Sequence, residues 1–421
     1  MPLLGHLNPM ATLARVLIER GHQVTFFQVP DFAPQVRGRG LDFVAYGERE
    51  LPEGTFPERY RALSRLEGLA ASRANLDIMT TQADALFEHA PAIVENARLD
   101  VWLIDHMDYA PATLAACMGA RFVTVILGLM RHWEDGVPGF SGEPYSDDPA
   151  VLERDRRFNL AMLAASKPFR EYLGAYRQKA GIGPFSLDTL WSSLAQITQE
   201  PAEFEFPRKL LPGCFHFTGP FARPSDRLPT PFPWERVQRR PLIYASFGTT
   251  QNRNPHLYDA VIKAAAGLDA QVVLSMGGAE TVERSADVPE NLLVVPFAPQ
   301  LEVLARADLM ITHAGMNSTL ECLAAGVPMV AVPIAHDQPG VAARIEWTGC
   351  GIRVPASECE PARLREAITR VLRETSFREA AQRFKGVIAE RGGLEHAADI
   401  IERVAATGKP VMRAQPSITS R

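Results

Sequence analysis

One segment of the chain places a histidine and a glycine turn between a buried strand and a helix. The apolar run 309–312 is followed by His313, by Ala-Gly-Met-Asn-Ser, and by a helical pattern through Ala325. The first N–H groups of such a helix lack partners, and together with the positive end of the helix dipole they bind anions. We expect Asn317 or Ser318 to cap the helix. The segment predicts a phosphate site in which His313 meets a phosphate oxygen.

A second strand of the same half ends in a similar turn. Ser-Phe-Gly-Thr-Thr at 246–250 supplies a glycine and two hydroxyl groups, which can also hold a phosphate. Asp337 and Gln338 follow a third strand. One strand–glycine–helix junction is common in α/β proteins, but two in one sheet indicate a ligand site at its carboxyl edge.

A separate candidate for proton transfer lies near the start of the chain. His6 stands in a turn before a helix that Asn8 can cap and Pro9 can open. An imidazole titrates near neutral pH, so it can take a proton from a hydroxyl group. Asp105 ends an apolar run and is expected to bond the other ring nitrogen, which would fix the tautomer. Two alternatives stay open: Asp105 only caps the following helix, or Asp108 is the orienting acid.

The elements that must position these groups alternate regularly between strands and helices. This alternation predicts parallel sheets with helices on both faces. Expected strands span residues 22–28, 41–47, 100–105, 121–127, 242–247, 271–275, 292–296, 309–313 and 329–333. Expected helices span residues 9–20, 110–118, 255–266, 300–305, 317–325 and 339–348, with helical sequence from 361 to about 406 and an unstructured tail from 408.

A proline-rich stretch divides the chain, because proline at this density continues neither a helix nor a central strand. The fold class expected is α/β, with two doubly wound Rossmann-like domains that face each other across a cleft. Residues 1–217 form the first domain, 218–235 the linker, 236–400 the second domain, and 401–421 a helix end and tail. One large sheet with a long surface loop is the alternative. Two long helical inserts, 66–94 and 152–179, either wall a cleft or serve packing.

Composition excludes several classes of protein. The 421 residues carry 44 Lys+Arg against 49 Asp+Glu, a net charge of −5, whereas nucleic-acid binding needs a basic surplus. No apolar run approaches the ~20 residues of a membrane span, and no export signal opens the chain. Five scattered cysteines without a C-x-x-C pair favour a reducing compartment and no zinc site. We therefore expect a cytoplasmic protein.

These motifs together resemble the donor-binding signature of nucleotide-sugar-dependent glycosyltransferases, the family of plant secondary-product and macrolide glycosyltransferases with the GT-B fold. The resemblance is carried by Phe-Ala-Pro-Gln at 297–300, Thr-His-Ala-Gly-Met-Asn-Ser at 312–318, Glu321, Gly-Val-Pro at 326–328, Asp337-Gln338 and Gly-His-Leu-Asn-Pro at 5–9. Phrases at 194–197, 206–209, 214–216 and 337–345 are similar to the bacterial zeaxanthin glucosyltransferases of this family. The resemblance covers nearly the whole chain.

The resemblance implies a role for each motif residue. Phe297 replaces the tryptophan that stacks on uracil in plant members, and Met316 departs from a tryptophan that helps to bind the sugar. His6 and Asp105 would be catalytic. The donor would be held by Thr249, Ser275, Phe297, Ala298, Gln300, His313, Gly315, Met316, Asn317, Ser318, Glu321, Asp337 and Gln338. The helix end, His313 and Thr249 would meet the charge of the leaving group, and the chain shows no D-x-D cluster, so no metal is expected.

The function expected from the resemblance is inverting O-transfer of a hexose, glucose above all, from a UDP-sugar to a lipophilic hydroxylated acceptor such as a carotenoid. UDP-sugar is a co-substrate, and no cofactor is expected. A macrolide- or flavonoid-type transferase, and a nucleotide-sugar-binding protein without turnover, are the alternatives. A lipophilic acceptor also suggests peripheral contact with the inner face of a membrane.

One further expectation concerns the first residues. In a doubly wound domain the first strand lies at the centre of the sheet, and the turn at 5–9 should follow its carboxyl end. Only four residues precede that turn, and Pro2 cannot donate a ladder hydrogen bond. We expect a strand of ~5–6 residues to belong upstream.

Overall fold

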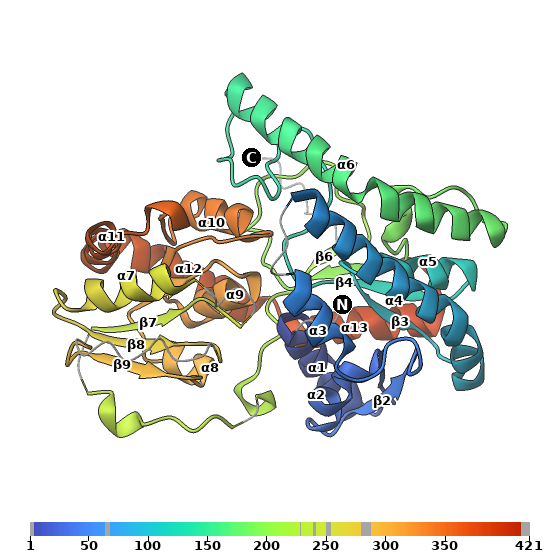
Figure 1. Cartoon of the computed structure of the whole chain (residues 1–421), viewed down its shortest axis with the longest axis horizontal. Coiled ribbons are helices and arrows are strands. Elements are labelled where there is room, and N and C mark those ends of the chain that lie inside the picture. The colour runs from blue at the N-terminus through green and yellow to red at the C-terminus, as the bar shows by residue number, and fades with distance from the viewer. Residues whose placement is uncertain are drawn as a thin grey trace.

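Two α/β lobes lie side by side in the computed structural model, which describes residues 4–63, 68–227, 229–238, 241–249, 254–278 and 288–413 (Figure 1). The C-terminal lobe, in yellow to orange, is built on one six-stranded sheet. The N-terminal lobe, in blue to green, contains a four-stranded and a two-stranded sheet. All pairings in the three sheets are parallel. The expected fold class, two parallel α/β units, is confirmed.

The sheet of the C-terminal lobe has the order β12-β11-β10-β7-β8-β9. The chain reverses its direction of winding between β7 and β10, and such a switch point is where parallel sheets bind ligands. Its strands are β7 (Leu242–Ser246), β8 (Gln271–Ser275), β9 (Leu292–Val295), β10 (Leu309–Thr312), β11 (Met329–Ala331) and β12 (Gly351–Arg353). Its helices are α7 (Pro255–Ala265), α8 (Gln300–Leu304), α9 (Met316–Ala325), α10 (Gln338–Trp347), α11 (Pro361–Arg373) and α12 (Thr375–Glu390).

The N-terminal lobe has the strand order β3-β4-β5-β6, and β1 and β2 form the separate sheet. Its strands are β1 (Thr25–Gln28), β2 (Asp42–Ala45), β3 (Trp102–Asp105), β4 (Phe122–Ile126), β5 (Gln196–Thr198) and β6 (Phe215–Phe217). Its helices are α1 (Leu4–Glu19), α2 (Ala33–Arg37), α3 (Thr55–Leu63), α4 (Gly68–Ala97), α5 (Tyr109–Cys117) and α6 (Pro149–Lys179). Short 3₁₀ turns lie at Pro30–Phe32, Leu187–Leu190, Pro224–Asp226, Trp234–Arg236 and Ala356–Glu358.

The start of α1 corrects the prediction that Asn8 caps a helix that Pro9 opens. The helix begins at Leu4, so His6 lies in its first turn and Pro9 lies inside it. Proline has no N–H, and at position 9 it leaves the carbonyl oxygen of Gly5 without its helical donor. The Asn317 side chain of the C-terminal lobe supplies one instead, with Nδ2 donating to that oxygen at 2.7 Å. The proline thus exposes an acceptor that joins the lobes.

The last helix corrects the predicted boundary at residue 400. Helix α13 (Gly393–Thr407), red in Figure 1, lies in the N-terminal lobe. Its apolar face, including Leu394 and Ile401, packs with Leu13 of α1 and Val123 of β4. Arg20, the residue after α1, also pairs with three acidic side chains of this helix, Glu395, Asp399 and Glu402. The boundary at 400 would therefore cut through a helix that belongs to the first lobe.

The predicted unstructured tail is also wrong for its first part. Val411 is buried, and its N–H donates to the carbonyl oxygen of Leu194 at 2.8 Å. The N–H of Arg413 bonds the carbonyl oxygen of Gly213 in the same way. The chain through Arg413 is thus hydrogen-bonded to the N-terminal lobe. Residues 414–421 lie outside the described residues.

The chain passes between the lobes twice, and the two passages touch. On its way from β6 toward the C-terminal lobe the chain passes Gly219 and Pro220, and on its return it enters α13 through Gly392 and Gly393. A Cβ atom on Gly219, where φ is +108°, would lie only 3.3 Å from the Cα atom of Gly393. Gly393 also has a positive φ of 46°. Both the backbone angles and the close approach favour glycine at this crossing.

A buried ion pair also joins the lobes. Arg344 of α10 is fully buried and donates to both carboxylate oxygens of Glu205 in the N-terminal lobe, at 2.6 and 3.0 Å. The same guanidinium donates to the carbonyl oxygens of Pro138 and Gly340 and lies over the ring of Phe206. The arrangement satisfies the geometry that a buried pair needs. It fixes α10, whose first residue is Gln338, against the N-terminal lobe.

No helix within the described ranges is long and apolar enough to cross a membrane.

Candidate functional site

A large cleft of about 3000 Å³ lies between the lobes. Its walls come from the carboxyl ends of the C-terminal strands on one side and from α1, α4 and α6 on the other. Of the predicted site residues only Asp105 does not line it. The predicted residues that do are His6, Thr249, Ser275, Phe297, Ala298, Gln300, His313, Gly315, Met316, Asn317, Ser318, Glu321, Asp337 and Gln338.

The first turn of α9 corrects the predicted cap. The N-cap residue is Gly315, and it has no side-chain capping bond. Asn317 is occupied elsewhere, because its Nδ2 binds Gly5 and its Oδ1 accepts from Gln199 at 2.5 Å. The first N–H groups of the helix are therefore not taken by a cap. They face the cleft with the positive end of the helix dipole, which is the arrangement that binds a phosphate.

His313 and Gly248 form the floor beside this helix end. Gly248 has φ of +76°, and a Cβ there would lie 2.8 Å from Cε1 of His313, so a side chain at 248 would displace the imidazole. Burial lowers the pKa of His313 to about 4, although Asp337 acts in the opposite direction. The ring is therefore neutral at pH 7, and its Nδ1 has no hydrogen-bond partner in the described part of the chain. It offers an oxyanion a hydrogen bond without a full charge.

Left-handed backbone conformations occur in the turns next to His313 and Asp337. Only three non-glycine residues in the described ranges have a positive φ, namely Arg98, Ala314 and His336. Ala314 follows His313, and His336 precedes Asp337. Left-handed conformations cost energy for residues with a Cβ and are concentrated at functional sites. Both strained residues belong to the turns that carry the predicted donor-binding groups.

Side chains of α8 and α9 form a hydrogen-bonded group. Glu321 is buried and accepts from Gln300 Nε2 at 2.6 Å, and Gln300 also donates to the hydroxyl of Ser318. The second partner of Glu321 is Arg227, which comes from the segment between the lobes. Phe297 stands nearby at the wall of the cleft, half exposed, as a stacking surface needs. Sequence reasoning missed Arg227, because nothing in a proline-rich segment indicates where one side chain will dock.

The predicted hydrogen bond between His6 and Asp105 is formed. His6 Nδ1 donates to Asp105 Oδ2 at 2.6 Å, while Asp105 Oδ1 accepts from the N–H of Met107. Burial would raise the pKa of Asp105, but His6 and neighbouring groups hold it well below its usual value. Asp105 therefore stays ionised, fixes the imidazole ring and leaves Nε2 of His6 for the cleft. The carboxylate that contacts His6 is that of Asp105, and Asp108 is instead the N-cap residue of α5.

Asp337 and Gln338 are both tied into the structure before any ligand binds. Asp337 Oδ2 accepts from the backbone N–H of Leu129 in the N-terminal lobe at 3.0 Å. The side-chain oxygen of Gln338 accepts from two backbone N–H groups of its own turn, those of Ile334 and Ala335. The loop that follows β4 thus meets the start of α10 within the cleft.

The opposite wall is apolar. Helices α4 and α6 correspond to the two predicted inserts, except that Leu66 lies outside the described residues. They contribute Leu76, Ile78, Met79 and Leu86 from α4, and Phe158 and Phe169 from α6. Ile78, Leu86 and Phe169 also pack in the core of this lobe. The inserts therefore both wall the cleft and stabilise the lobe.

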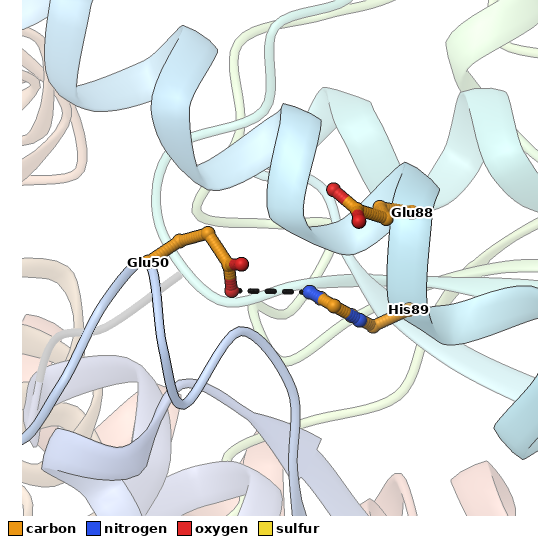
Figure 2. A group of neighbouring side chains, drawn as sticks. All are labelled: Glu50, Glu88 and His89. Atoms are coloured by element: carbon orange, nitrogen blue, oxygen red, sulfur yellow. Dashed lines mark hydrogen bonds and ion pairs between the residues drawn. The ribbon is translucent and has the colours of Figure 1, made fainter.

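A possible cation site lies elsewhere. Within the described residues, only Glu50, Glu88 and His89 bring three ligand-type atoms together (Figure 2). His89 Nε2 is already paired with Glu50 at 3.0 Å, Glu88 is exposed, and none of the three lines the cleft. We assign no metal to this group.

Several histidines of the structure are buried or partly buried and neutral, which predicts acid sensitivity. Burial lowers the pKa of His132 and His313 to about 4, and lowers that of His106 and His216 as well. In the unfolded chain these side chains titrate near 6.5. Below pH 6.5 the unfolded state therefore binds more protons, and the free energy of unfolding falls as the pH falls toward 4.

Between pH 6.5 and 4.5 we expect the free energy of unfolding to fall by up to about 3 kcal/mol for each fully shifted group. The melting temperature should drop steeply with it. Thermal melts over this range measure the slope. The His132→Gln variant should show a shallower slope, because one titrating group is removed. A melting temperature that does not change over this range would contradict the burial of these rings.

Comparisons with known proteins give a consistent result. Residues 259–402 match the family described as erythromycin biosynthesis protein CIII-like, C-terminal domain. The chain is 30% identical to zeaxanthin glucosyltransferase of Pantoea ananas, over 98% of this chain and 96% of that protein. It is 35% identical to the uncharacterized UDP-glucosyltransferase YojK of Bacillus subtilis (strain 168), over 94% of each. Its fold matches the glycotransferase of kitacinnamycin with a TM-score of 0.74 at 24% identity, over 96% of each chain.

Proposed function

Because the chain belongs to the family of nucleotide-sugar-dependent glycosyltransferases with the GT-B fold, we propose that it moves glucose from UDP-glucose to a hydroxyl of a lipophilic acceptor. Transfer of a sugar to a small molecule is the activity of its relatives, and the sugar, the base and the acceptor are the proposal. The observation that carries it is the His6–Asp105 pair at a cleft with an apolar wall on one lobe and an anion site on the other.

The proposed reaction is a single displacement. His6 Nε2 takes the proton of the acceptor hydroxyl, and Asp105 stabilises the imidazolium that forms. The acceptor oxygen forms a bond to the anomeric carbon while the bond from that carbon to the diphosphate oxygen breaks. Attack opposite the leaving group inverts the configuration. UDP leaves with the electron pair, and its charge is met by the N–H groups of α9, His313 and Thr249. No metal and no cofactor take part.

We propose that residues lining the cleft bind the base, the ribose, the diphosphate and the sugar of the donor as follows. Phe297 stacks on the uracil ring, Ala298 and Gln300 meet the base and ribose edges, and Ser275 contacts the uridine. Glu321 binds the ribose hydroxyls, and its hydrogen bond from Arg227 holds the carboxylate in place. Gly315, Asn317 and Ser318 belong to the phosphate-binding turn. Asp337 and Gln338 bind hydroxyls of the sugar beside Met316.

A carotenoid such as zeaxanthin is the acceptor that we propose. A long apolar molecule with a terminal hydroxyl suits a wall made of α4 and α6, and a relative named for zeaxanthin spans the whole chain. Such an acceptor resides in lipid, so we propose that the enzyme works at the cytoplasmic face of a membrane. A macrolide or flavonoid acceptor is the second candidate, which the match to an erythromycin-type family favours.

The test is a panel of zeaxanthin, a flavonol and a macrolide, each with UDP-glucose. We expect the highest kcat/KM with zeaxanthin in detergent micelles. A wide preference for the flavonol or the macrolide would refute the carotenoid proposal and leave small-molecule transfer standing. Slow hydrolysis of UDP-glucose without acceptor would separate an enzyme from a binding protein without turnover.

A further inference from the structure

We propose that His106, the residue after Asp105, is a second sugar-binding residue, whose Nε2 binds a hydroxyl of the transferred sugar beside Asp337. The inference rests on the proposed function, because it takes the sugar of a nucleotide sugar as the ligand. Neither the motifs nor the comparisons assign a role to this histidine.

His106 is held rigidly beside the proton-transfer pair. Its side chain is only 3% exposed, and its ring is stacked on that of His6, with centroids 6.3 Å apart and planes at 11°. Nδ1 accepts from the backbone N–H of Leu127 at 3.3 Å and lies 3.3 Å from Asp105 Oδ1. The ring is thus fixed on one side by β4 and on the other by β3.

The other ring nitrogen has nothing to bind. Nε2 of His106 has no hydrogen-bond partner within the described ranges, although it is buried. A buried polar atom without a partner costs free energy, so it indicates a ligand that supplies one. Burial also lowers the pKa of the ring, so the imidazole is neutral near pH 7 and offers a hydrogen bond without charge.

The direction of Nε2 is given by Gly128. A Cβ built on Gly128 would lie 3.8 Å from Cε1 and 4.0 Å from Nε2 of His106, and 3.0 Å from Oδ2 of Asp337. The space that glycine leaves at this point is therefore bounded by an imidazole of one lobe and a carboxylate of the other. Gly128, His106 and Asp337 all line the cleft.

A hydroxyl group fits this pair of partners. It can donate to the carboxylate of Asp337 and accept from Nε2–H of His106. If the ring is in its other tautomer, with Nδ1–H donating to Asp105, the hydroxyl donates to Nε2 instead. The ligand is a sugar hydroxyl because the site includes Asp337, on the lobe that binds the donor.

Calorimetry with UDP and with UDP-glucose, both without acceptor, tests the inference. In the His106→Phe variant we expect UDP-glucose to bind about tenfold more weakly, the value of one buried hydrogen bond, while UDP binds within twofold of the wild type. Gly128→Ala should also weaken UDP-glucose selectively, because its methyl group lies 3.0 Å from Oδ2 of Asp337 and fills the space between that oxygen and His106; this variant tests the space and not His106 alone. His132→Gln, at a buried histidine outside the cleft, is the matched control and should change neither affinity.

The outcomes are distinct. Equal losses for UDP and UDP-glucose in His106→Phe, or no loss in either variant, would overturn the role of His106 while wild-type transfer upholds the proposed function. A wild-type protein that neither transfers glucose nor binds UDP-glucose more tightly than UDP would overturn both. Should His106→Phe fail to fold, His106→Asn decides instead, because its amide can replace Nδ1 of the imidazole but not Nε2.

Discussion

Replacing His6 by alanine is expected to lower kcat by about 10²–10⁴, the usual value of a general base. The affinity for UDP should stay within a few-fold of the wild type, because His6 belongs to α1 and its side chain binds Asp105, not the turn of α9. Turnover with saturating acceptor and calorimetry with UDP measure the two quantities separately.

A matched control for this variant is His22→Ala. His22 lies just after the same helix and pairs with Glu402 at the surface, so its loss should leave turnover unchanged. Asp105→Asn should lower kcat as well, because the amide cannot stabilise the imidazolium. Near-normal turnover of His6→Ala would remove this histidine from the mechanism.

Replacing Glu205 by alanine is expected to cost about 3–5 kcal/mol of stability, because it leaves the guanidinium of Arg344 buried without its carboxylate. Urea unfolding of the variant and the wild type measures the difference. Glu203→Ala is the matched control, since Glu203 forms an exposed pair with Arg391 that also joins the lobes and is worth at most about 1 kcal/mol.

The double variant Glu205→Met with Arg344→Met separates the two causes of the loss. If the cost comes from an unpaired buried charge, the double variant should recover part of the stability that Glu205→Ala loses, although Arg208, which also pairs with Glu205, keeps within the described residues only its bond to the carbonyl oxygen of His132. A double variant as unstable as the single one would mean that packing around Phe206, and not the charge, is what Glu205→Ala disturbs.

The C-terminal sheet could be predicted closely from the sequence. The strand predicted at 271–275 is β8 to the residue, and the runs predicted at 242–247 and 309–313 each extend one residue beyond β7 and β10. These strands are buried on both faces and therefore appear as continuous apolar runs. β5, β6 and β12, of three residues each, were not predicted; β11 is as short but lies inside the longer apolar run 329–333, which made it recognisable.

Site residues that follow strand ends could be predicted from the sequence. Residues whose position depends on contacts between the lobes could not. His6 and Asp105 were paired correctly, since a histidine near a helix start and a carboxylate at a strand end meet at one sheet edge. Arg227, His106 and the Arg344–Glu205 pair were missed. Each depends on a residue far away in the sequence, as Arg227 does on Glu321. The prediction that Asn317 caps α9 is wrong because its side chain binds Gly5 instead.

The contact of the two chain passages at Gly219 and Gly393 has a mechanical consequence. Because the two connections meet at one point, a side chain at position 219 would press the first passage against the second at Gly393. A strain placed there would act on both lobes at once, at a distance from the contacts of Arg344, Asp337 and Asn317 that hold the lobes together around the cleft.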